Sequence, residues 1–432
     1  MTHKPWAPLR ALLIIVALLS VPAQPAEGQT ETPAPPSEAQ PDPWDPLFDD
    51  TVLHEIRLTI NTRAWASLKE HYLEDTYYPA NFQWNGQTVR NVGIRSRGTG
   101  SRSGIKPGLR VDFDRYSTSQ KLLGLKSLVL RNNTQDSSSL RERISMRLFK
   151  RMGLAAPLEA HAKLYVNNSY AGLYSIVQSI DKTFLKDTFG EDEGYLYKYD
   201  YPADAQPYYF ENRGADPSLY VPLPFQPETH EDDPHAEVIE RLVWTINETS
   251  DGAFRTAIAE FLDLDRFLAH VAVEVFLAES DGFLGNWAMN NYYLYRFTDR
   301  NLFTMIPWDK SHAFVDGFAS SIWHYITDRE PQEQNRLMKR VLSFADLRER
   351  YLDHLMNVVR SASEIAEGQS QGPGWLEREV QREYEQVRDA ALADSEKPYS
   401  NEEFERAVTE LGAFARHRAE SVSREVAESR PR

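Results

Sequence analysis

The chain has 432 residues, no cysteine and a formal net charge of −16, from 48 basic and 64 acidic side chains. Without thiols, the sequence excludes disulfide frameworks, cysteine nucleophiles and cysteine-ligated metal centres. The negative charge disfavours nucleic acid or anionic membranes as partners, and the 41% hydrophobic content is typical of a packed globular protein.

The first 23 residues have the pattern of a secretory signal peptide. Lys4 and Arg10 form a basic start, residues 11–19 are apolar, and cleavage is expected after Ala23. A membrane anchor is the alternative, but a span needs about 20 apolar residues, so we expect no membrane span after cleavage. Residues 24–46 are rich in Pro, Ala, Glu and Ser, which predicts an extended spacer. The folded part is therefore expected in the periplasm, on the cell surface or outside the cell.

Residues 47–225 are predicted to form a β-rich lobe, because apolar and polar residues alternate with the period of half-buried strands. The turn Asn85-Gly86 is typical of a hairpin. A helix is predicted from Ser139 to Met152, with Glu142 as the partner of Ser139 in a capping box. Strands are expected at residues 52–60, 80–84, 89–94, 109–113, 127–130, 163–166 and 172–177, and a short helix at residues 65–71.

Residues 226–432 are predicted to form a helical lobe. A β-hairpin, residues 291–296 and 302–308, interrupts the helices. The fold class expected is therefore α+β, a β-rich lobe followed by a helical lobe with a cleft between them. Helices are expected at residues 237–246, 254–261, 265–278, 347–359, 375–392 and 404–422, the last one capped by Ser400 and Glu403.

The first candidate site combines the loop from Asp281 to Asn286 with Asp309. Asp281 follows a long apolar helix, and the hairpin returns the chain so that Asp309 can lie close to Asn286. Phosphoryl transfer needs such a set, with one carboxylate to orient the acceptor hydroxyl and an amide oxygen plus a second carboxylate to hold Mg²⁺ or Mn²⁺. The alternative is that Asp281 and Asn286 are turn residues and Asp309 caps a strand.

The second candidate site is cationic. Residues 90–110 contain six basic side chains and no acid, around a loop of small residues that begins at Arg97. Backbone N–H groups and cations of this kind suit phosphate oxygens. Lys106 is the candidate partner of the phosphates, held by Glu142, although Glu142 could serve only in the capping box. A flexible surface turn is the alternative for the whole segment.

Taken together, several motifs resemble the CotH family of spore-coat-type atypical kinases, from about residue 52 to about residue 425. The segments that carry the resemblance are residues 92–98, 172–174, 180–185, 194–198, 281–286 and 306–309. The resemblance implies a divergent protein-kinase-like fold with two lobes, the use of ATP with a divalent metal, and phosphorylation of Ser or Thr hydroxyls of a protein substrate. It also implies that Asp281 is the catalytic-loop aspartate, Asn286 and Asp309 the metal ligands, and Lys106 the phosphate-binding lysine.

Two departures from the family pattern remove negative charge near the proposed cleft. Ser311 stands where the family commonly has a second aspartate after Asp309, and residues 177–179 lack the glutamate that often precedes the segment Ile180-Asp181-Lys182. Two functions therefore remain open. The chain is either an exported ATP-dependent protein kinase or a weak or inactive surface protein that binds a partner.

Overall fold

The computed structural model describes residues 42–200, 207–286 and 288–430. The predicted signal peptide and most of the predicted spacer lie outside these residues. The last spacer residues are ordered, since Trp44 and the short 3₁₀ helix Asp45–Leu47 contribute buried side chains to the core of the first sheet. No helix in the described ranges is long and apolar enough to cross a membrane.

In the described part, the first half of the chain forms a closed barrel with the strand order β1-β2-β3-β4-β5-β7-β6. Strands β1 and β6 pair in parallel, and the other neighbours are antiparallel. The strands are β1 (His54–Ile60), β2 (Tyr78–Trp84), β3 (Gln87–Ser96), β4 (Leu109–Asp112), β5 (Ser127–Arg131), β6 (Glu159–Val166) and β7 (Ser169–Gln178). All the strands expected before residue 178 are confirmed, and so is the Asn85-Gly86 turn, whose residues both have positive φ.

Two helices accompany the barrel, α1 (Thr62–Glu70) and α2 (Arg141–Arg151). The capping box predicted at the start of α2 is wrong. Asp136 accepts the backbone N–H of Arg141, whereas the hydroxyl of Ser139 contacts the hydroxyl of Tyr399. Helix α2 therefore begins two residues later than predicted, and the carboxylate of Glu142 is available for another partner.

A second sheet has the strand order β11-β10-β8-β9. In the sequence, β8 and β9 come before α4, and β10 and β11 lie between α6 and α7. Its strands are β8 (Tyr195–Tyr199), β9 (Phe225–Pro227), β10 (Tyr292–Arg296) and β11 (Phe303–Pro307). The predicted hairpin is β10–β11, with Tyr292 opposite Pro307. Strand β8 was not predicted from the sequence. It lies within the range predicted for the β-rich lobe, but it pairs with β10 of the second sheet.

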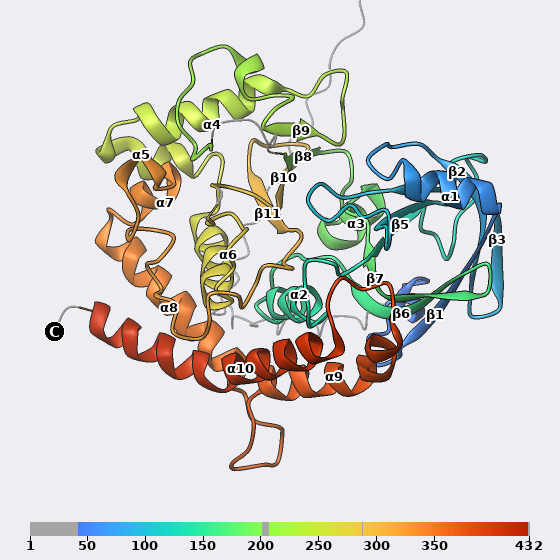
Figure 1. Ribbon diagram of the computed structural model, residues 1–432. Helices are drawn as coiled ribbons and strands as arrows, with labels where there is room; N and C mark the ends of the chain where they lie inside the picture. Colours follow the sequence, from blue (N-terminus) through green and yellow to red (C-terminus); the bar gives the residue numbers. More distant parts are fainter. Residues whose placement is uncertain (1–41, 201–206, 287, 431–432) are drawn as a thin grey trace, which may run out of the picture. The chain divides into compact units, whose positions relative to one another are not determined.

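The helices after the barrel confirm the mixed α+β class (Figure 1). Helices α3 and α7 were not predicted because both are short; Asp181, which caps α3, was the available signal. The capping box at the start of α10 is confirmed. The helices are α3 (Lys182–Phe189), α4 (Ala236–Glu248), α5 (Asp251–Ile258), α6 (Leu264–Phe276), α7 (Arg336–Val341), α8 (Ala345–Ala362), α9 (Trp375–Ala393) and α10 (Asn401–Ser429).

The apolar face of helix α2 packs into the core that the helices form, and α2 also contacts strand β6 of the barrel. Its apolar residues Ile144, Leu148 and Phe149 belong to the core that the helices form, and not to the core inside the barrel. Arg143 of α2 forms buried ion pairs with Glu379 and Glu383 of α9. Helix α2, which carries Glu142, is therefore held by the helices on its apolar face.

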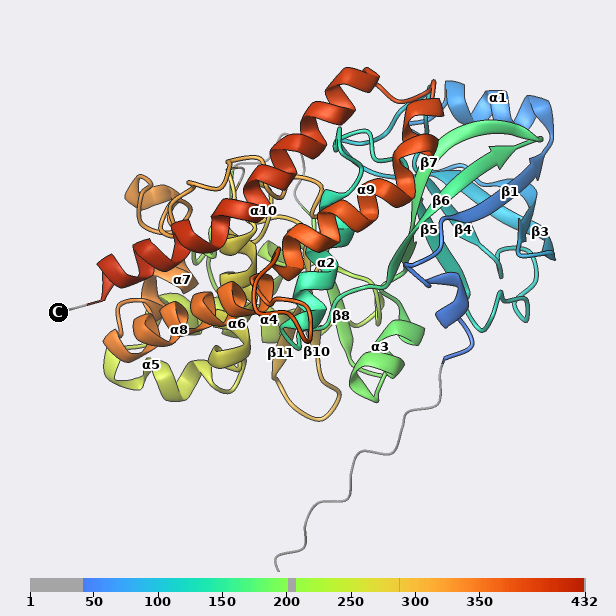
Figure 2. The same cartoon turned by 90° about the horizontal axis from the view of Figure 1, so that it is seen from below.

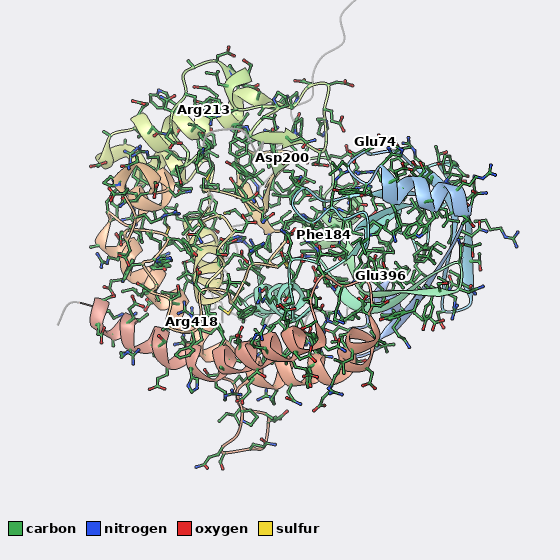
Figure 3. All side chains as sticks on the ribbon, in the orientation of Figure 1. Glu74, Phe184, Asp200, Arg213, Glu396 and Arg418 are labelled. Atoms are coloured by element: carbon green, nitrogen blue, oxygen red, sulfur yellow. The ribbon has the colours of Figure 1, made fainter. Side chains whose placement is uncertain are left out.

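Helices α9 and α10 run together along one side of the fold, as both views show (Figures 1 and 2). Arg418 of α10, labelled in Figure 3, is completely buried and donates to the carbonyl oxygens of Val275 and Phe276 at 2.7 and 2.8 Å. Since these carbonyls end α6, Arg418 fixes the point from which the chain runs to Asp281.

Candidate active site

The loop between α6 and β10 carries Asp281. Its carboxylate accepts two side-chain N–H groups, from Asn290 at 2.8 Å and from Asn291 at 2.9 Å. The same Asn291 amide also lies 2.9 Å from the backbone carbonyl of Asp281. Burial raises the pKa of Asp281, Asn290 lowers it, and the nearby charge of Asp309 raises it; the balance is a raised pKa. Asp281 and Asp309 therefore lie within one electrostatic environment, whereas the hairpin argument had predicted Asp309 close to Asn286.

Asn286 does not join this group. Its side-chain amide donates to the hydroxyl of Tyr325 at 3.3 Å, and the residue is exposed. Asn290 and Asn291, which the sequence analysis did not single out, contact Asp281 instead. The available signal was the hairpin register: Asn291 directly precedes β10, and the pairing of Tyr292 with Pro307 brings it beside Trp308, next to Asp309.

Asp309 has two close partners. Its Oδ2 atom lies 2.5 Å from Nη1 of Arg131, at the end of β5, and its Oδ1 atom accepts the hydroxyl of Ser311 at 2.8 Å. Burial by itself raises the pKa of Asp309, but the Arg131 charge and the Ser311 hydrogen bond outweigh burial and hold the pKa well below its usual range. Asp309 is therefore ionised at neutral pH.

Arg131 also contacts α2. Its Nε atom lies 2.7 Å from Oε2 of Glu142, so one guanidinium bridges the barrel, helix α2 and the Asp309 loop. Glu142 in turn neighbours the buried carboxyl of Glu159 on β6, and burial raises the pKa of both groups. Arg131 supplies one positive charge to this pair and to Asp309, and its charge opposes the effect of burial on both glutamates.

The expected contact between Lys106 and Glu142 is not present. The ammonium group of Lys106 is 1% exposed, lies 2.6 Å from Oδ2 of Asp394, and donates to the carbonyl of Leu173 at 2.8 Å. Asp394 follows α9 and is 288 positions away in the sequence. Lys106 therefore joins the C-terminal helices to the barrel, and Arg131 takes the position beside Glu142 that the sequence analysis gave to Lys106.

The acid-free basic segment is largely neutralised by acids from elsewhere. Arg95 and Arg102 both pair with Asp75, at 2.8 and 2.5 Å, and Arg110 pairs with Asp112 at 2.7 Å. Arg97 differs, because its side chain has no ion pair or hydrogen bond among the described residues. Its guanidinium lies 5.6 Å from the ring centroid of Trp308. Burial, and to a smaller extent repulsion from Arg131, lowers the pKa of Arg97 to about 10.

Arg97 opens onto a cleft of about 840 Å³ between the barrel and the second sheet. Val129, Ile180 and Leu196 provide apolar walls, and Tyr293 and Trp308 add aromatic surface. A mostly preformed cleft of this size, with a few polar groups that converge, is typical of a small-molecule site. Trp308 connects the cleft to Asp309, the next residue in the chain.

A buried ion pair between Lys310 and Glu274 holds the loop that carries Asp281. Lys310 donates to Glu274 of α6 at 2.6 Å and to the carbonyl of Asn291 at 3.1 Å, and Glu274 accepts the N–H of Phe283. Glu279 accepts the N–H of Asp281 at 2.8 Å. These contacts hold the residues beside Asp281, Asn291 and Asp309 in place. Lys310, Glu274 and Glu279, which make them, do not line the cleft.

The oxygen atoms that remain suit a hard divalent cation. The side-chain amides of Asn290 and Asn291 each donate an N–H to Asp281, which leaves their oxygens, together with the carboxylate of Asp309, as candidate ligands. Carboxylate and amide oxygens are ligands that Mg²⁺ and Mn²⁺ prefer. The described residues hold no cluster of three or more His, Cys, Asp or Glu side chains arranged for a metal, so a cation here would depend on amide oxygens and on ligands from a bound phosphate.

Comparisons with known proteins agree with the resemblance. The family model described as CotH kinase protein matches residues 94–422. Inner spore coat protein H of Bacillus subtilis strain 168 is 24% identical over 367 residues, which cover 84% of this chain and 95% of that protein.

Two solved structures have low overlaps with this fold. HipA of Shewanella oneidensis MR-1, solved with HipB and operator DNA, has a TM-score of 0.32 at 13% identity, over 70% of this chain and 59% of that one. The proinflammatory kinase CtkA of Helicobacter pylori has a TM-score of 0.29 at 8% identity, over 74% of this chain and 94% of that one. These overlaps are too low to define a shared fold, whereas the family model covers most of the sequence: the chain belongs to the CotH kinase protein family.

Proposed function

We propose that this protein is an ATP-dependent phosphotransferase with a two-lobed, kinase-like arrangement that phosphorylates Ser or Thr hydroxyls of a protein outside the cytoplasm. One observation carries the proposal. Asp281, held by two asparagine amides, lies in the electrostatic field of a second carboxylate, Asp309, which is paired with Arg131.

Each residue has a chemical task in this proposal. Asp281 accepts a hydrogen bond from the acceptor hydroxyl and takes its proton as the hydroxyl oxygen attacks. Asp309 and the amide oxygens of Asn290 and Asn291 would hold a divalent cation, which supplies charge neutralisation for the phosphates when bound. Arg97 at the cleft and Arg131 beside Asp309 provide further positive charge.

Arg131 gives the site two arrangements. In the structure its guanidinium occupies Oδ2 of Asp309, which is also an oxygen that a cation would use. A cation must therefore compete with Arg131, and a displaced Arg131 can remain on Glu142 while it turns a donor toward the phosphates.

The second candidate function is a surface protein without turnover. The occupied Asp309 carboxylate and the hydroxyl of Ser311, in place of a second carboxylate, favour it. Both candidates fit a protein exported by the predicted signal peptide, whose residues lie outside those described.

The test is transfer of label from γ-labelled ATP to casein and to the protein itself, with Mg²⁺ or Mn²⁺, using the chain without residues 1–23. We expect labelling by the wild type and a loss of about 10³-fold or more in Asp281→Asn, as for removal of a catalytic base and its positioning. Asp346→Asn, a surface change on α8, serves as the control and should label like the wild type. Equal labelling by the Asp281 variant, or none by any form, would refute the kinase and leave the binding protein.

A further inference from the structure

A second cavity, of about 710 Å³, shares no lining residue with the cleft among the described residues. We call it the α2–α6 cavity, because the end of α2 and the beginning of α6 line it together with the end of α3, the β10–β11 turn and β11. Figure 1 shows α2, α3, α6 and β11 around the middle of the fold. Its volume lies within the range of small-molecule sites.

The body of this cavity is aromatic and aliphatic. Phe189, Phe267, Phe297 and Phe303 line it, together with Met305. Such a lining favours an apolar ligand body, since removing apolar surface from water is favourable.

The charged lining is more basic than acidic, although the chain as a whole has a net charge of −16. Lys150, Arg266 and Arg300 line the cavity against Asp187 and Asp263. The carboxylate of Asp263 already accepts two backbone N–H groups at the start of α6.

None of these three cations forms a close ion pair in the part of the chain that the structure describes. Arg300 has a distant acidic neighbour, with its Nε atom 3.7 Å from Asp299. The side chains of Lys150 and Arg266 have no ion pair or hydrogen bond within the described residues, and both residues are exposed. The charge of Asp187 acts on Lys150 without an ion pair between them, so an anionic group at the mouth of the cavity would provide a close partner for both cations.

His270 supplies an independent observation. It lines the cavity and is 1% exposed, and its Nδ1 atom has no hydrogen-bond partner in the described part of the chain. Its Nε2 atom lies 3.5 Å from Oε1 of Glu274, which is long for a hydrogen bond. Buried polar side chains are nearly always satisfied, so this ring is a candidate partner for a polar atom of a ligand.

We propose that the α2–α6 cavity binds an amphipathic organic anion, a molecule with a carboxylate or sulfonate head and an aromatic or aliphatic body. The head lies at Lys150 and Arg266, and the body packs on the phenyl rings. The proposal is independent of phosphotransfer, because the cavity contains none of the residues placed in the candidate active site.

The experiment uses the chain from residue 24 and 8-anilinonaphthalene-1-sulfonate, an aromatic sulfonate whose fluorescence rises in apolar surroundings. We expect saturable binding at one site per chain. Arg266→Glu and Lys150→Glu should each weaken binding about tenfold or more, because each replaces a charge-assisted contact with repulsion. Arg255→Glu, an exposed change on α5 whose partner is Asp346, should leave the affinity unchanged.

A cavity-filling variant separates shape from charge. Thr304→Trp on β11 places a large ring in the cavity and should abolish the fluorescence rise without lowering the melting temperature by more than a few degrees. Displacement of the probe by decanoate would identify an aliphatic body, and its failure an aromatic one. Affinity that is the same in Arg266→Glu, Thr304→Trp and the wild type, or no saturable binding, would overturn the proposal.

Discussion

Arg131 and Glu142 form the ion pair that connects the barrel with helix α2, with Nε of the arginine 2.7 Å from Oε2 of the glutamate. The second contact of Arg131, with Asp309, makes this arginine a competitor for the carboxylate that a metal would use. Removal of Arg131 should therefore affect the binding of metal and the binding of nucleotide differently.

Arg131→Met should change these two affinities in opposite directions. Mn²⁺ alone should raise the melting temperature of the variant more than that of the wild type, because Asp309 is no longer neutralised by a guanidinium. ATP added with Mn²⁺ should raise it less, because a phosphate partner is lost. Differential scanning fluorimetry measures both, with Arg57→Met on the outside of β1 as the control. Equal shifts in the variant and the wild type would contradict the role given to Arg131.

Asn290 and Asn291 should matter more than Asn286. Asn291→Ala removes a hydrogen bond to Asp281 and a candidate metal oxygen, and we expect phosphotransfer to fall about 100-fold, as for residues that support a metal site. Asn286→Ala should alter it by about twofold or less, because this amide contacts Tyr325. Initial rates with γ-labelled ATP test the contrast, and a larger loss in Asn286→Ala would restore the residue chosen from the D-x4-N spacing.

Phosphotransfer should decline at acidic pH as Asp281 takes up a proton. The pKa of Asp281 is raised by burial and by Asp309, so the decline sets in at a higher pH than for an ordinary aspartate. Asn290→Ala removes the hydrogen bond that lowers this pKa and should move the acidic limb of the kcat/KM profile further upward. An unmoved limb would show that another group controls the profile.

Lys106→Met should reduce stability by about 3–5 kcal/mol, because it leaves Asp394 buried without a partner. The double variant Lys106→Met/Asp394→Leu should recover most of that loss, since both charges are then replaced by apolar groups. Urea unfolding measures the three values. The affinity of the folded double variant for ATP should match that of the wild type; loss of nucleotide binding there would indicate that Lys106 does contact phosphates.

Glu159→Gln should make stability less dependent on pH. Burial raises the pKa of Glu159 in the folded state above its unfolded value, so the folded state binds more protons and stability falls as pH rises above about 4.5. Glutamine cannot titrate, and the variant should therefore gain on the wild type between pH 6 and pH 9 in urea unfolding. The gain should be absent in Glu55→Gln, an exposed change on β1.

Local sequence determined the elements and the two carboxylates of the candidate site. Alternation predicted the barrel strands, apolar spacing predicted the long helices, and the hairpin predicted the return of Asp309 toward the loop from Asp281 to Asn286. Strand and helix periods and short turns depend on neighbouring residues, so local sequence is enough to predict them. The same hairpin logic, carried one step further through the register of Tyr292 and Pro307, points to Asn291. The sequence analysis instead chose Asn286, the asparagine that follows Asp281 at the fifth position.

Tertiary structure decided which cations face the candidate site. Residues 90–110 are free of acid in the sequence, yet Asp75 neutralises Arg95 and Arg102, and Asp394 neutralises Lys106 from 288 positions away. A charge acts through whatever lies within a few ångströms in space. Only the folded chain therefore distinguishes Lys106, which joins the C-terminal helices to the barrel, from Arg97 and Arg131, which lie beside Trp308 and Asp309.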